Sequence, residues 1–242
     1  MHYLRPEIAR RLIPADVPDP DKLPGLNSVA SDLDRSRWEE IVTIVGACGG
    51  GGVIGTGLID LTSGQVLALR DHIVDGEVTI FDSNAIVLYL AEKTGKFLPK
   101  QAADRGPMLS WLMFVASGIG PFTGQYVHFK TYAPEKIAYA LNRYEFEALR
   151  HWGIVDAHLA KNKYMAGDTY TIVDMALWGW GRLVPNILGE QAAKFANVKR
   201  LVDEISARPA AQKAAALKDR YAFKTEMDEE AKRAMFPGNY RS

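Results

Sequence analysis

The sequence of 242 residues is short of cysteine, has no surplus of either charge and lacks an apolar leader. Its single cysteine, Cys48, excludes an intramolecular disulfide, a CxxC dithiol and a zinc site built from several cysteines. Because 29 lysines and arginines balance 29 aspartates and glutamates, the chain lacks the basic footprint of a nucleic-acid-binding protein. Residues 1–20 carry charge and proline where a secretory signal is apolar, so we expect a cytoplasmic protein.

The patterns of several other protein classes are also missing. The five histidines show no HExxH or comparable ligand spacing, and GxSxG and P-loop patterns do not occur. One uncharged segment, Ile41–Ile59, is almost long enough to cross a bilayer, but seven of its residues are glycine, which disfavours a helix. We therefore expect no metal, no membrane span and no nucleic-acid partner.

What the chain does contain is a change from strand-like to helix-like patterning. Prolines make residues 1–36 an irregular arm, and the β-branched runs Ile41–Val45 and Val78–Phe81 predict strands. Downstream of the second run the pattern is helical. The sequence therefore predicts an α/β N-terminal domain over residues 1–99 and an all-helical domain over residues 100–242, with a ligand site between them.

Two helices are predicted from the spacing of apolar residues. Ser83–Lys93 places them on one face and is followed by Gly95, which favours a left-handed helix stop. Residues 135–161 predict a long amphipathic helix with one buried stripe: Ile137, Leu141, Tyr144, Ala148, Trp152, Val155 and Leu159. Three charged residues fall off this stripe and are expected to face solvent, a ligand cleft or another subunit: Arg143, Glu147 and Arg150. His151 and His158 are expected to be ordinary surface or interface residues.

A further helix start is encoded in Tyr170–Met175. Thr171 can cap the amide of Asp174, while the Asp174 carboxylate reaches back to the Thr171 amide. The helix that follows is apolar nearly all round, which predicts a place in the middle of a helical bundle. This capping box is interpreted as a folding device and not as an active site.

Several motifs follow one another in residues 76–242: FDSNAIVLYLAEKTGKFLP at 81–99, WLMFVASGIGPFTGQYVHF at 111–129, NRY at 142–144, GDTYTIVDMALWGW at 167–180 and NVKRLVDEISARP at 197–209. Together they resemble the glutathione transferase superfamily, and more specifically its bacterial nu class of disulfide-reductase-type members. The resemblance implies a thioredoxin-like N-terminal domain, an all-helical C-terminal domain, a homodimer and glutathione as co-substrate.

The resemblance also implies a glutathione site. In the family an acid–Ser pair before Ala-Ile holds the γ-glutamyl end, and these roles fall on Asp82 and Ser83. Helix-start amides favour a carboxylate and an aspartate neutralises an ammonium, although an ordinary helix cap would use the same residues. Arg143 matches an arginine that contacts glutathione, often across the dimer; the alternative is a solvated helix face. Gln65 corresponds to a further glutathione contact.

The N-terminal half departs from the family pattern. The chain has no proline between Pro24 and Pro99, so the family's cis-proline before the third strand is missing. No thiol-activating residue can be identified, and an isolated cysteine such as Cys48, without a nearby cation, is more often an inert apolar residue. We hypothesise that residues 25–75 are a degraded or frame-disrupted thioredoxin-like domain.

We therefore predict a glutathione-dependent transferase or disulfide-bond reductase acting on disulfides, peroxides or small electrophiles. Its second substrate would lie over an aromatic cluster of a kind that is more often core or interface: Trp111, Phe114, Phe122 and Tyr126. Two alternatives stay open. One is a non-catalytic, dimeric binding module that has lost its thiol site. The other is a dinucleotide-binding protein, suggested by the GxGxxG spacing of GGGVIG at 50–55.

Overall fold

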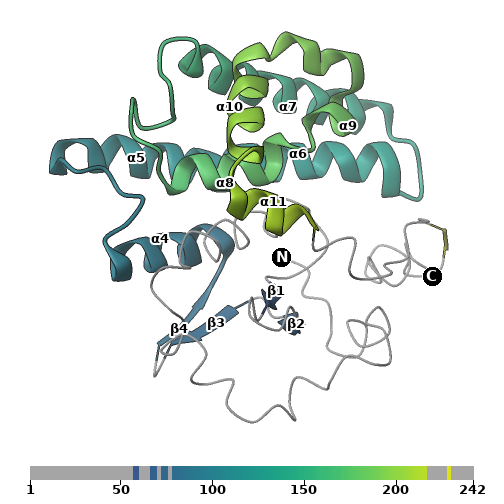
Figure 1. Cartoon of the computed structure of the whole chain (residues 1–242). Coiled ribbons are helices and arrows are strands. Elements are labelled where there is room, and N and C mark those ends of the chain that lie inside the picture. The colour runs from purple at the N-terminus through teal and green to yellow at the C-terminus, as the bar shows by residue number, and fades with distance from the viewer. Residues whose placement is uncertain (1–56, 60–65, 70–71, 76–77, 217–227, 230–242) are drawn as a thin grey trace.

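The computed structural model describes residues 57–59, 66–69, 72–75, 78–216 and 228–229. In Figure 1 the strands lie apart from helices α5 to α10, and helix α4 lies between the two groups. Within the described ranges, no helix combines the length and the apolar character that a bilayer span requires.

In the described part of the N-terminal region, four short strands form two antiparallel pairs. Strand β1 (Gly57–Ile59) pairs with β2 (Val66–Leu69), and β3 (His72–Asp75) pairs with β4 (Val78–Phe81). Strand β4 confirms the prediction made from its β-branched residues, which fit a pleated surface.

Several predictions fall outside the described residues: the arm 1–36, the strand Ile41–Val45, Cys48, the glycine motif at 50–55 and Gln65. The segment 25–75, taken above for a degraded thioredoxin-like domain, is described only in part. That hypothesis therefore stays a prediction.

Helix α4 (Ser83–Thr94) begins and ends where the local signals predict. The Asp82 Oδ1 accepts hydrogen bonds from the backbone N–H groups of Asn84, at 2.9 Å, and Ala85, at 3.2 Å. Gly95 ends the helix in the left-handed region, with φ 68°. The helix contacts β4 and α8, so it connects the strands to the helical domain. Its inner face is buried and consists of Ile86, Val87, Leu90 and Ala91.

A continuous helical segment follows, built from α5 (Ala102–Phe114), the π-helical turn η4 (Val115–Ile119), α6 (Gly120–Val127) and a second π-helical turn, η5 (His128–Tyr132). A π-helical turn holds about one residue more than an α-helical turn. Each such turn therefore changes which residues downstream share a face with those upstream.

Helix α7 (Ala138–Leu159) is the long amphipathic helix expected over 135–161. Four residues of the predicted stripe are fully buried: Ala148, Trp152, Val155 and Leu159. Leu141 and Tyr144 are partly buried against the core, whereas Ile137 precedes the helix and is exposed.

The expectation for the flank of this stripe is wrong at two positions. Glu147 and His151 are both buried within the chain. Glu147 was expected to face solvent, a ligand cleft or another subunit, and His151 was expected to be an ordinary surface or interface residue. The reason is that α6 and η4 pack against α7 and cover the flank next to the stripe. His158 is half-buried, with its ring 4.3 Å from that of Trp111.

Helix α8 (Ile172–Gly181) occupies the centre of the bundle, as predicted, with nine of its ten residues buried. It contacts α4, α5 and α10. The capping box of Thr171 and Asp174 is present at its start. The remaining helical elements are α9 (Val184–Leu188), η6 (Gly189–Lys194), α10 (Ala196–Ser206) and α11 (Pro209–Ala216).

Candidate functional site

The residue before α4 has a backbone conformation that is unusual for an aspartate. Asp82 lies at φ 70° and ψ 126°, in the region that favours glycine. Such a conformation costs about 1–3 kcal/mol and is found mostly where function requires it. The Asp82 side chain is exposed, and both of its cap hydrogen bonds end on Oδ1. Among the described residues, its Oδ2 has no hydrogen-bond partner.

The first amide N–H groups of α4 differ in whether they donate to the Asp82 cap. Asn84 and Ala85 donate to Asp82, whereas the amide and hydroxyl of the half-buried Ser83 donate to no other group in the described part of the chain. Asp82 and Ser83 thus lie next to each other at the start of α4, where Asp82 is exposed and Ser83 is half-buried.

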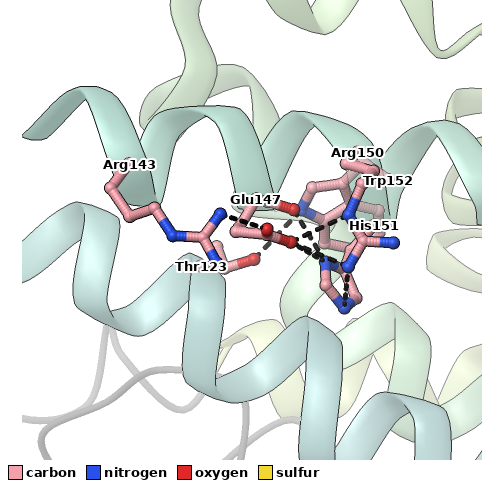
Figure 2. Close-up of polar contacts among 6 residues, drawn as sticks. All are labelled: Thr123, Arg143, Glu147, Arg150, His151 and Trp152. Carbon is pink, nitrogen blue, oxygen red and sulfur yellow. Dashed lines mark hydrogen bonds and ion pairs between the residues drawn. The ribbon is translucent and has the colours of Figure 1, made fainter.

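Arg143 lies on α7 beside a buried carboxylate, as Figure 2 shows. Its Nη1 donates to Glu147 Oε1. Arg150 donates from Nε and Nη2 to Glu147 Oε2, at 2.8 and 2.7 Å. The Glu147 side chain is 8% exposed, whereas the two arginine side chains are 50% and 46% exposed. Two exposed guanidinium groups are therefore held by one buried carboxylate.

This arrangement keeps Glu147 ionised. The hydrogen bond from Arg150 lowers the pKa of Glu147; burial acts in the opposite direction, and the contact with Arg143 lowers the pKa further. Because two positive charges face one negative charge, the group retains a positive charge at the surface of α7.

His151 completes the cluster from the inside. Its Nδ1 lies 2.7 Å from the backbone carbonyl oxygen of Glu147, and its Nε2 lies 3.5 Å from Arg150 Nη2. These partners assign the proton to Nδ1, which donates to the carbonyl, and leave Nε2 as an acceptor. The ring packs between Phe114 and Phe122, with ring centroids 5.1 and 4.6 Å away.

The π-helical turn η4 explains how two phenylalanines reach one imidazole. Phe114 and Phe122 are eight residues apart, which on an uninterrupted α-helix would leave their side chains about 80° apart around the axis. The additional residue in η4 brings them to within about 20° of each other. Gly118 in the same turn lies so close to His151 that a Cβ there would be 2.6 Å from the ring Cδ2.

We expect Gly118→Ala to lower the free energy of unfolding by about 1–3 kcal/mol, because the new Cβ would force the His151 ring to shift out of its packing with Phe114 and Phe122. Gly153→Ala is the matched control. A Cβ at Gly153, in α7, meets nothing within 4 Å, so that variant should be as stable as the wild type or more stable. Urea unfolding followed by circular dichroism compares them, and equal stability of the two variants would contradict the tight contact.

The other predicted residues are placed as follows. Gln65 lies outside the described residues. In the aromatic cluster expected to receive the second substrate, Trp111 packs edge-on against Phe114, and Tyr126 is buried. The Tyr126 hydroxyl donates to Glu145, and burial, aided by that carboxylate, raises the pKa of Tyr126 to about 12. Among the described residues, no group of three or more His, Cys, Asp or Glu side chains could hold a metal ion.

Sequence reasoning missed the roles of Glu147 and His151. A signal for Glu147 was present, because arginines four residues before it and three residues after it can both reach a glutamate on a helix. For His151 no local signal existed, since both of its ring neighbours come from the segment that carries η4.

Comparison with known proteins adds a second line of observation. Residues 129–209 match the family model of the glutathione S-transferase C-terminal domain. The chain is 39% identical over 173 residues to disulfide-bond oxidoreductase YghU of Escherichia coli K12, covering 68% of this chain and 60% of YghU. It is 37% identical over 152 residues to disulfide-bond oxidoreductase YfcG of the same organism, covering 60% of this chain and 69% of YfcG.

A solved structure is similar over a larger share of the chain. The structure of glutathione transferase YghU from Streptococcus pneumoniae, complexed with glutathione, matches with a TM-score of 0.59 at 30% identity. The match covers 76% of this chain and 81% of that one. By contrast, the present chain spans only about three fifths of the length of YghU from Escherichia coli.

Proposed function

This chain belongs to the glutathione S-transferase superfamily, and from that premise we propose that it is a cytoplasmic, glutathione-dependent disulfide-bond reductase. The observation that carries the proposal is its similarity to two disulfide-bond oxidoreductases. Peroxides and small electrophiles form the wider class of second substrates. The proposal divides the chain into a thioredoxin-like domain, residues 1–99, and a helical domain, residues 100–242.

The γ-glutamyl end of glutathione is assigned to the start of α4. Its ammonium group pairs with the Asp82 carboxylate, whose Oδ2 makes no bond within the described part of the chain. Its carboxylate accepts hydrogen bonds from the Ser83 amide and hydroxyl, at the positive end of the helix dipole. The exposed and unusual backbone at Asp82 supports this assignment.

Arg143 is assigned to a carboxylate of glutathione, because a guanidinium can bind a carboxylate through two parallel hydrogen bonds. We further propose a homodimer that uses the outer face of α7, where Arg143 lies. Tyr139 and Phe146 on this helix are 80% and 61% exposed, which is unusual for large apolar side chains. A second copy covering this face would bring Arg143 to the partner's ligand. Gln65 is proposed as a further contact with glutathione.

The chemistry is thiol–disulfide exchange. The thiolate of one glutathione attacks a sulfur of the substrate disulfide, breaks the S–S bond and releases one substrate thiolate, which takes up a proton. A second glutathione thiolate attacks the mixed disulfide and releases the other substrate thiol. Two glutathiones are thereby oxidised to glutathione disulfide while the substrate disulfide is reduced to two thiols. The protein's task is to lower the thiol pKa of bound glutathione.

A second candidate function is a dimeric binding module that retains the glutathione site but performs no turnover. The observation that favours it is the absence of proline between Pro24 and Pro99, which removes the family's cis-proline. This candidate shares the site at Asp82 and differs from the first only in its chemistry.

Calorimetric titration tests the shared site. We expect reduced glutathione to bind at least about tenfold more tightly than the dipeptide cysteinylglycine, which lacks the γ-glutamyl group and its two charged contacts. A folded protein that binds neither ligand, or both equally, would contradict the proposed site. Glutathione-dependent reduction of a small disulfide, measured on the same sample, then separates the reductase from the binding module.

A further inference from the structure

The carboxylate of Glu147 has an unusual position for an acidic residue that contacts two exposed arginines. It is buried on α7, the helix that packs against α6 and η4, and each of its oxygens accepts hydrogen bonds from a different guanidinium. Figure 2 shows Arg143 on one side of the carboxylate and Arg150 on the other. Arg143 lies four residues before Glu147, and Arg150 lies three residues after it. This spacing places the three side chains on neighbouring turns of one helix.

Stability alone does not account for this placement. Exposed ion pairs three or four residues apart on a helix contribute little, and burying a carboxylate is costly. An apolar residue at position 147 would fill the same space beneath α6 without that desolvation cost. The presence of a buried carboxylate at position 147 is explained if its function is to fix the positions of the two arginine side chains.

We propose that Glu147 is a positioning residue that holds the Arg143 guanidinium ready for a carboxylate of glutathione, and that Arg150 offsets the negative charge of Glu147. This inference rests on the proposed function and assigns a role to residues that do not contact the ligand themselves.

The physical basis is pre-organisation. A free arginine side chain samples many rotamers, and a ligand that binds it must order it. Here the bond to Glu147 orders Arg143 when the protein folds, so the ligand does not bear this cost. The other N–H groups of Arg143, whose side chain is half-exposed, remain for the ligand.

Arg150 supplies a second positive charge, so that the pairing of Arg143 with Glu147 does not leave the cluster neutral. A single arginine paired with a single carboxylate is neutral and attracts an anion weakly. With Arg150 present, two guanidiniums share one carboxylate, and the positive charge of Arg143 is not cancelled. The cluster therefore suits an anionic ligand group.

The experiment exploits the fact that pre-organisation and net charge predict opposite effects for Glu147→Gln. Removing the negative charge makes the cluster more positive and would by itself strengthen the binding of anionic glutathione. Glutamine offers one uncharged acceptor oxygen to two guanidinium groups, so it holds Arg143 less firmly, and this effect weakens the binding of glutathione. We expect Glu147→Gln to raise the calorimetric Kd for reduced glutathione by about 2- to 10-fold. Glu145→Gln, a neighbour whose carboxylate meets Tyr126, is the matched control and should change the Kd less than twofold.

A double-mutant cycle separates positioning from a general structural effect. Arg143→Met should raise the Kd by about tenfold, and Glu147→Gln should then add no further loss in that background. Thermal unfolding of every variant verifies that each is folded at the titration temperature.

The outcomes distinguish this inference from the proposed function. The inference alone is overturned if Glu147→Gln binds glutathione as tightly as the wild type or more tightly. It is also overturned if the losses of affinity in the double-mutant cycle are additive, or if Arg143→Met leaves the Kd unchanged. A folded wild-type protein that binds no glutathione overturns the proposed function and this inference together.

Discussion

Replacing Asp174 by alanine is expected to destabilise the protein more than any other substitution of an acidic side chain within the described helices. The carboxylate is fully buried and accepts hydrogen bonds from the backbone N–H groups of Met165 and Thr171, both at 2.8 Å. Without it, two buried amides lose their partner, each at a cost of about 1–3 kcal/mol. Near pH 4.5 the buried carboxyl group is protonated, and the desolvation cost of burying this polar group, which alanine avoids, offsets part of the loss. We therefore expect a net loss of about 2–4 kcal/mol at this pH.

The loss of stability in Asp174→Ala is also expected to depend on pH. Burial raises the pKa of Asp174 to about 6, against the effect of the hydrogen bonds from Met165 and Thr171. Between its ordinary pKa of 3.8 and about 6, the folded state holds a proton that the unfolded state releases. The stability that Asp174 contributes is therefore complete below about pH 4 and is lost as the pH rises through about 6.

Urea unfolding of the wild type and Asp174→Ala at a series of pH values tests both statements. The stability difference between them should shrink by roughly 1–3 kcal/mol between pH 4 and pH 7. Asp203→Ala is the control, because Asp203 is exposed and pairs with Lys199 at 2.5 Å on the surface of α10, so its loss should cost less than about 0.5 kcal/mol. A difference for Asp174→Ala that stays constant with pH would contradict the protonation of the buried carboxyl group.

Replacing Asp82 by asparagine is expected to remove most glutathione binding while leaving the fold intact. The amide oxygen of asparagine can accept the same hydrogen bonds from Asn84 and Ala85, and asparagine tolerates a positive φ. Only the charge is lost. Because a hydrogen bond to a charged group contributes about 1.5–3 kcal/mol, we expect the Kd to rise by about 10- to 100-fold.

Two further variants locate the cause of that loss. Asp82→Ala loses the cap as well as the charge, so its unfolding free energy should also fall, by about 0.5–2 kcal/mol. Asp104→Asn removes a charge from the first turn of α5 and should leave glutathione binding unchanged. If Asp82→Asn binds glutathione within twofold of the wild type, the ammonium group is not held by Asp82.

The elements that could be predicted from the sequence are those whose cause lies within a few residues. The cap at Asp82, the stop at Gly95 and the box at Thr171 and Asp174 each depend on hydrogen bonds or backbone angles within four residues. The central place of α8 followed from its apolar composition, which leaves it no polar face for solvent. The family followed because its motifs stand in order along the chain.

The burial of Glu147 and His151 could not be predicted in this way. Periodicity identifies the most apolar stripe of α7, but it does not show how wide an arc of the helix a neighbour will cover. That arc depends on η4, where a π-helical turn brings Gly118 against the His151 ring and aligns Phe114 with Phe122.

The sequence by itself thus determined helices α4, α7 and α8, the end signals of α4 and α8, the central place of α8 and the superfamily, because short-range hydrogen bonds and apolar spacing act along the chain. Only the tertiary structure decided that Glu147 would be a buried carboxylate between two exposed arginines. It also showed that the backbone at Asp82 lies in the left-handed region. The reason for the burial of Glu147 is physical: it depends on which distant segments pack against α7, and that packing is made only when the chain has folded.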